Sequence, residues 1–87
     1  MRLTVHTIIS VYCEEDEATE MNVLGTFIDE NEARECFEKQ KQEEQERAEY
    51  NDFEIYSDCE IYFEAGEDGN FNNNFCMLEW HKQEFEI

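Results

Sequence analysis

The chain has 87 residues, the size of one small domain, and its 24 acidic residues outnumber its 6 basic residues to give a net charge of −18. A folded surface this acidic repels nucleic acid and anionic membranes, so both are excluded as direct partners, and it attracts basic surfaces. Aromatic residues make up 14% of the chain and the apolar residues recur with clear periods, which excludes a disordered acidic tail. We therefore expect a single acidic domain over residues 1–87.

The first third of the chain predicts a hairpin of two strands. In residues 3–13 the side chains alternate between two faces of a strand. One of these faces carries Leu3, Val5, Thr7, Ile9, Val11 and Cys13. The run EEDEATE at 14–20 predicts a solvated loop, because five acids in seven residues cannot continue a buried strand. Residues 21–28 form the second predicted strand, in which Gly25 is a candidate bulge.

Residues 30–49 predict a helix. Asp29 is the expected N-cap, and Glu32, three residues later, completes a pair that resembles a capping box. Ala33, Cys36 and Phe37 form an apolar stripe at helical spacing. Beyond Phe37 the stripe gives way to KQKQEEQER, so we expect the second half of the helix to extend past the sheet.

The last third of the chain predicts two more strands. Residues 53–64 alternate strictly between apolar and polar positions, which indicates one continuous strand with a buried face and a solvated face. A turn follows at 66–70, and a last strand begins near Phe75, with a bulge at 81–83 where the apolar parity changes. The apolar face of that strand carries Cys76, Leu78 and Trp80. The order ββαββ defines an α+β fold, with an antiparallel sheet of about four strands and one helix packed on one face.

No catalytic motif stands out, so we do not expect an enzyme. The four cysteines are separated by 23, 23 and 17 residues and the two histidines by 75, whereas zinc sites draw on close pairs of ligands. We expect the cysteines to be reduced and the protein to be cytoplasmic, because the sequence shows neither a CxxC pair nor a signal peptide nor a long apolar span.

The segment DGNFNNNFCMLE at 68–79 resembles the EF-hand order of oxygen ligands. Its candidate metal ligands are Asp68, Asn70, Asn72 and Glu79. Asn73 stands at the sixth position, where the EF-hand needs glycine, and the flanking residues predict strands rather than helices. The segment fits an ordinary turn equally well, so we expect no resident metal or cofactor.

The acidic face of residues 53–64 is the candidate partner-binding site. It carries Glu54, Tyr56, Asp58, Glu60, Tyr62 and Glu64. Successive residues on one face of a strand lie about 6.7 Å apart, which is similar in order to the ~3.4 Å rise between phosphates of a nucleic-acid strand. Tyrosine is enriched at interfaces, and this segment contains no Lys or Arg to offset its acids. The alternative is that this is the ordinary solvent face of the sheet.

In size, charge and lack of catalytic motifs, the chain resembles small phage-encoded inhibitors that mimic nucleic acid, such as anti-CRISPR and anti-restriction proteins. The likeness covers the whole chain but rests on composition and acidic spacing, so it carries over no functional residue. It implies a non-enzymatic protein that occupies the basic groove of a nucleic-acid-binding defence enzyme in the host cytoplasm. The alternatives are a generic acidic adaptor of a basic protein and a small cation-binding module. Whether the protein is a monomer or a homodimer stays open.

Overall fold

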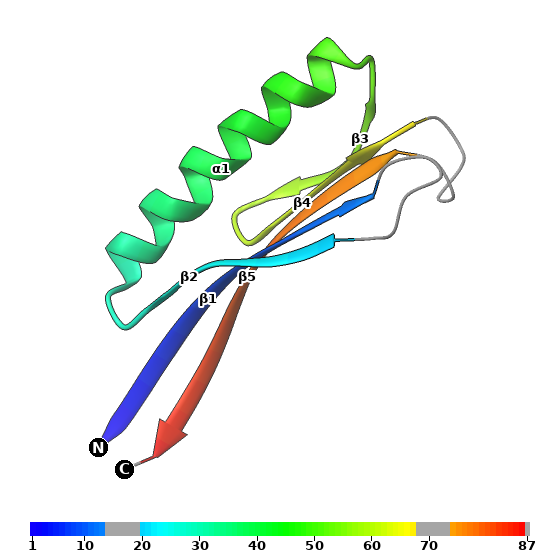
Figure 1. Ribbon diagram of the computed structural model, residues 1–87. Coiled ribbons are helices and arrows are strands. Elements are labelled where there is room, and N and C mark those ends of the chain that lie inside the picture. Colours follow the sequence, from blue (N-terminus) through cyan, green and yellow to red (C-terminus); the bar gives the residue numbers. More distant parts are fainter. Residues whose placement is uncertain (14–19, 68–73, 87) are drawn as a thin grey trace.

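The computed structural model describes residues 1–13, 20–67 and 74–86. These residues form, in chain order, β1 (Arg2–Cys13), β2 (Glu20–Phe27), α1 (Glu30–Tyr50), β3 (Glu54–Cys59), β4 (Tyr62–Gly66) and β5 (Phe75–Glu86). The strands make one antiparallel sheet in the order β2-β1-β5-β4-β3, and α1 lies across one face of it (Figure 1). The predicted α+β class is confirmed, although the described sheet has five strands instead of about four.

Helix α1 begins where the sequence predicts. The Asp29 side chain accepts a hydrogen bond of 2.8 Å from the backbone N–H of Asn31, which satisfies one of the unpaired donors at the helix start. Phe37 in the first half of the helix and Glu44 and Ala48 in the second half are all buried. The second half therefore packs on the sheet, and the expectation that it extends past the sheet is wrong. In the second half of α1 the contact with the sheet is made by the Glu44 carboxylate and the small Ala48 side chain. The apolar stripe in the sequence therefore ends before the contact does. No helix in the described segments is long and apolar enough to span a membrane.

Residues 53–64 form two strands, so the prediction of one continuous strand is wrong. The chain turns at 60–61, and β3 and β4 pair as an antiparallel hairpin in which Cys59 lies opposite Tyr62. The register also shifts at Tyr56, which reverses the alternation of faces within β3. A two-residue turn places Cys59 and Tyr62 on the same face and so shifts the parity of the alternation, and the bulge at Tyr56 shifts it once more. The two shifts cancel, so Ile55 and Phe63 share a face with the parity of one continuous strand. This is why the pattern concealed the turn.

Strands β1 and β5 pair along their full length without a register shift, beginning with Arg2 opposite Glu86. The prediction of a bulge at 81–83 is therefore wrong. The strand is unbroken, and Phe85 simply lies on the face opposite to that of Trp80. The bulge expected at Gly25 is present in β2, but it lies at the preceding residue, Leu24. There the pairing of β2 with β1 skips Leu24.

The core lies between α1 and the sheet face that it covers. Its large side chains are Ile8, Phe37, Phe63, Leu78 and Trp80. The Trp80 indole N–H donates a buried hydrogen bond of 3.0 Å to Nδ1 of His6, so neither polar group is left without a partner in the core. Cys76, Leu78 and Trp80 share the covered face of β5, as predicted.

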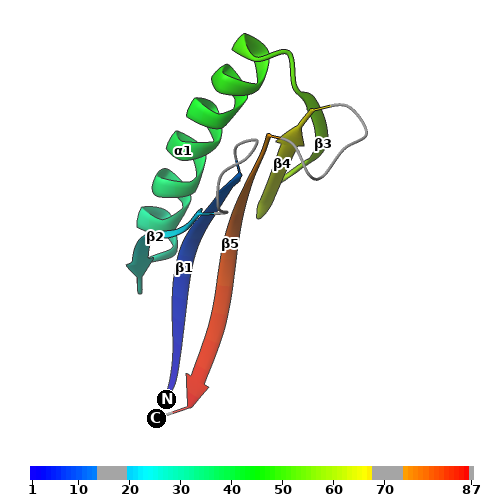
Figure 2. The ribbon, with the colours of Figure 1, turned by 45° about the vertical axis from the view of Figure 1, so that its right-hand side comes forward.

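The opposite face of the sheet is left uncovered by the described elements (Figure 2). On β1 the helix covers the face that carries His6, Ile8 and Ser10, which are all buried. The residues of β1 that the sequence groups on one face, from Leu3 to Cys13, belong to the uncovered side. Phe63 of β4 and Leu78 and Trp80 of β5 decide which face of β1 is covered, because α1 packs on the side of the sheet where they lie. The more apolar face of β1 consequently looks away from the helix.

Cys36, Cys59 and Cys76 carry free thiols in different surroundings. Burial raises the pKa of Cys76 from 9.0 to about 12, and the charge and hydrogen bond of Glu44 act in the same direction. Cys59, in contrast, is exposed. The folded state therefore keeps the proton of Cys76 at a pH where the unfolded chain has lost it.

Alkaline pH is expected to destabilise the protein through Cys76. A thiol pKa raised on folding contributes stability below the unfolded pKa of 9.0, and this contribution is lost as pH rises from there toward 12. Urea unfolding at about pH 8 and about pH 10 should show a larger loss for the native protein than for Cys76→Ala. The matched variant Cys59→Ala should retain the native pH dependence. Equal pH dependence in all three proteins would contradict the assignment.

Candidate functional site

The sheet face opposite α1, here called the open sheet face, carries many apolar side chains, which Thr7, His81 and Gln83 interrupt. This apolar strip consists of Leu3, Val5, Ile9, Val11, Met21, Val23, Phe75, Met77 and Phe85. It is accessible to solvent, and Met21 and Val23 on β2 are 69% and 62% exposed. The solvated face of an antiparallel sheet is ordinarily polar, so an exposed strip of this extent is typical of a protein interaction site.

Next to the strip, on the β5, β4 and β3 side, lies a group of acids, here called the acidic flank. It consists of Glu54, Glu64 and Glu79, with Tyr62 among them. Glu79 lies opposite Tyr62, and Glu64 lies opposite Met77 of the strip. Glu64 is therefore the diagonal neighbour of Glu79 on one side and of Glu54 on the other, at about 7–8 Å each.

The acidic flank makes its surroundings electrostatically negative. The Tyr62 hydroxyl donates a hydrogen bond of 3.0 Å to Oε2 of Glu64. Burial raises the pKa of Tyr62 to about 12, with further contributions from that hydrogen bond and from the charges of Glu64 and Glu79. Tyr62 therefore keeps its proton to a higher pH than an ordinary tyrosine, and it offers an aromatic surface beside the carboxylates of Glu64 and Glu79.

The sheet separates the six predicted partner-binding residues into groups. Glu54, Tyr62 and Glu64 lie on the open sheet face. Glu60 lies in the turn between β3 and β4, and Tyr56 lies at the bulge, where its hydroxyl donates to the backbone carbonyl of Glu67. The predicted single row of charges is therefore not formed, because the turn and the bulge place its members at different positions.

Asp58 is the predicted residue that lies on the helix side of the sheet. It forms an ion pair with Lys41 of α1 and accepts a hydrogen bond of 3.1 Å from Nε2 of Gln45. Lys41 also donates a hydrogen bond of 2.9 Å to the backbone carbonyl of Cys59. These contacts join β3 to the helix, which is a structural role.

Glu79 is the member of the acidic flank that the predicted row lacks. The sequence places it only among the candidate calcium ligands, and Asp68, Asn70 and Asn72 of that set lie outside the described residues. The sequence did contain a signal for this position. Glu79 is two residues from Met77 in the same strand, so the two side chains lie on the same face. Within the described segments, no three His, Cys, Asp or Glu side chains are grouped closely enough to hold a metal ion.

Basic residues are segregated from the open sheet face. Four of the six lie on α1, namely Arg34, Lys39, Lys41 and Arg47. The other two are Arg2 of β1 and Lys82 of β5, and the alternation of these strands places both on the helix side of the sheet. Several of these cations stack on aromatic rings beside the helix, as Arg34 does over Trp80 at 5.2 Å and Arg47 over Tyr12 at 4.9 Å. No Lys or Arg of the chain therefore offsets the acidic flank on its own face.

Comparison of the chain with protein-family models, with curated proteins and with solved structures finds no match. The function is therefore inferred from the residues themselves and from their arrangement in the fold.

Proposed function

We propose that the open sheet face binds a basic surface of another protein, and that the protein acts without catalysis, as an inhibitor or adaptor, through this contact. The observation that carries the proposal is the segregation of charge. Three carboxylates flank an exposed apolar strip, while every Lys and Arg lies on the helix or on the helix side of the sheet. Ordinary surfaces mix charges of both signs.

The chemistry of the face indicates what its partner should look like. Protein interfaces combine an apolar centre with a polar rim, and here Met77, which pairs with Val11 in the strip, lies directly opposite Glu64 in the flank. A complementary partner presents apolar side chains next to Lys or Arg. A second copy of the chain fits less well, because two acidic flanks and two net charges of −18 would repel each other.

The class of partner that we propose is a protein whose basic surface normally binds nucleic acid. Neighbouring carboxylates of the flank are diagonal across strand pairs and lie about 7–8 Å apart, which is similar in order to the separation of charges along a nucleic-acid strand. The overall charge also accelerates association with a basic groove at low salt. Such a partner could not hold this protein and its nucleic acid at the same groove together.

Competition is the experiment that tests this function. Immobilised protein is expected to retain a basic partner from the native host, and the partner's own nucleic acid is expected to displace it. Retention should fall steeply with added salt, because the contact depends on charge. A partner that nucleic acid does not displace would identify a general acidic adaptor instead. Retention that is indifferent to salt, or a partner without a basic surface, would contradict the proposal.

A further inference from the structure

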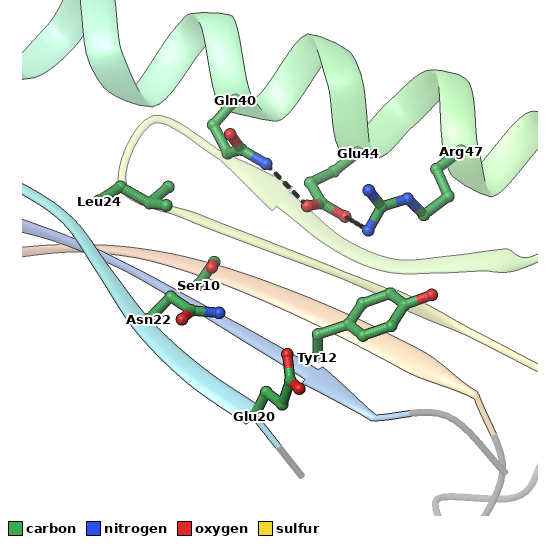
Figure 3. A pocket seen from close by; sticks show the side chains of 8 residues that line it. All are labelled: Ser10, Tyr12, Glu20, Asn22, Leu24, Gln40, Glu44 and Arg47. Atoms are coloured by element: carbon green, nitrogen blue, oxygen red, sulfur yellow. Dashed lines mark hydrogen bonds and ion pairs between the residues drawn. The ribbon is translucent and has the colours of Figure 1, made fainter. Parts of the chain in front are cut away.

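A second candidate site lies on the other side of the sheet, between α1 and the edge formed by β1 and β2 (Figure 3). It is a pocket of about 500 Å³. Its lining is polar apart from Leu24 and includes Ser10, Glu20, Asn22, Gln40, Glu44 and Arg47. The apolar core fills the helix–sheet contact over β4 and β5 and reaches Phe27 of β2, whereas beside the pocket Glu20 and Asn22 of β2 face the helix.

The helix wall of the pocket holds the Glu44 carboxylate, which also interacts with the Cys76 thiol and has one oxygen left without a hydrogen bond. Glu44 is only 3% exposed, and it points from α1 toward the strands (Figure 3). Its Oε1 accepts a hydrogen bond of 2.9 Å from Nε2 of Gln40, but its Oε2 is buried without a hydrogen bond. Nη1 of Arg47 forms an ion pair with Oε2 at 3.6 Å, a separation beyond hydrogen-bond distance. A buried carboxylate oxygen without a donor is costly, so a donor supplied from outside would be stabilising.

The charges and acceptors around Glu44 favour a cation. Glu20 and Glu44 carry two negative charges against the one positive charge of Arg47, which is held over the ring of Tyr12. The strand wall adds the hydroxyl of Ser10 and the side-chain amide of Asn22, whose oxygens can accept hydrogen bonds. The pocket therefore offers several acceptors on two facing walls around a net negative charge.

We propose that this pocket binds a guanidinium group carried on an alkyl chain. A guanidinium is planar, presents five N–H donors, and is more weakly hydrated than an ammonium, so it can donate to Glu44 and to the strand wall together. An ammonium is compact and strongly hydrated, and it loses more on entering a pocket. This site lies on the helix side of the sheet, and it is independent of the function proposed for the open sheet face.

N-acetyl-arginine amide is the probe that tests the pocket, followed by amide chemical shifts in NMR. The expected shifts centre on Asn22, Gln40 and Glu44. N-acetyl-citrulline amide has nearly the same shape without the charge, so it should bind at least about tenfold more weakly. N-acetyl-lysine amide should also bind more weakly than the arginine probe. Equal binding of the arginine and citrulline probes, or shifts confined to other surfaces, would overturn the proposal.

Two isosteric variants separate the pocket from the general negative field of the protein. Glu44→Gln removes the charge in the pocket and should weaken binding of the arginine probe by about tenfold or more. Glu43→Gln removes the same charge from the neighbouring exposed position and should have little effect. Asn22→Ala, on the strand wall, should also weaken binding of the arginine probe. It serves as an independent test if Glu44→Gln perturbs the helix packing. Equal affinities for the Glu44 and Glu43 variants, or unchanged binding by Asn22→Ala, would overturn the assignment.

The guanidinium could belong to a small molecule or to an arginine of a protein. Agmatine and an arginine flanked by glycines in a capped peptide distinguish the two sources. Binding of both probes supports a site open to a protein side chain, and binding of agmatine alone supports a small-molecule site. Binding of neither would overturn the proposal. The experiment requires no partner of the open sheet face, so its outcome leaves the proposed function untouched.

Discussion

Phe37→Ala is expected to lower the free energy of unfolding by about 3–5 kcal/mol. The Phe37 ring is completely buried, and it packs against Trp80 with a centroid distance of 5.9 Å. Its removal would leave a cavity at the centre of the only helix–sheet contact that the described residues make. A domain of this size has a total stability of about 4–13 kcal/mol, so the variant should be close to unfolding at room temperature. Urea denaturation followed by circular dichroism measures the change.

Phe85→Ala is the matched control for this prediction, because it is the same substitution on the open sheet face. Phe85 is 46% exposed, so its truncation should cost less than about 1.5 kcal/mol. Similar losses for the two variants would show that α1 does not organise the core. A small loss for Phe37→Ala would show the same.

Reversal of the acidic flank is expected to reduce partner binding by about 100-fold or more. The triple variant E54K/E64K/E79K replaces three carboxylates that would face a basic surface with three cations that would repel it. These side chains point away from the helix, so the core should be retained. Thermal unfolding of the variant checks this, and titration calorimetry with the captured partner measures the affinity.

The matched control reverses three exposed acids on the outer side of α1, in the variant E35K/E43K/E46K. The change in net charge is the same, but the open sheet face is intact. Binding should weaken by less than about tenfold, mainly through slower association, because only the long-range attraction is reduced. Equal losses in the two variants would mean that the partner responds to net charge and not to a particular face. Retained binding by E54K/E64K/E79K would show that the open sheet face is an ordinary solvent surface.

The sequence was sufficient for the features that depend on local chemistry. The N-cap at Asp29 and the start of α1 follow from a side chain that satisfies a nearby backbone donor. The α+β class follows from periods of two and of about 3.6 that are readable over short windows. The strongly acidic character, and the lack of Lys or Arg in residues 53–64, are properties of composition alone.

Local patterns were not sufficient where two different arrangements share one period. In residues 53–64 the bulge at Tyr56 and the turn at 60–61 each shift the alternation by one residue, and together they reproduce the parity of one continuous strand. Only the pairing of Cys59 with Tyr62 reveals the hairpin. Helix α1 shows a similar limit. Glu44 resembles an exposed acid in a charged run, and only the packing of α1 on the sheet buries it.

The candidate site depended on one tertiary choice, namely which face of β1 the helix covers. Both faces of this strand carry apolar residues, so its own sequence left the choice open. Trp80 and Leu78 on β5 and Phe63 on β4 decided it, because α1 buries the most apolar area by packing on their side. The same choice exposes Val11 and Met77 on the open sheet face and places Glu54, Glu64 and Glu79 beside them. The sequence by itself determined the charge of this protein, and the pairing of distant strands decided where that charge meets an apolar surface.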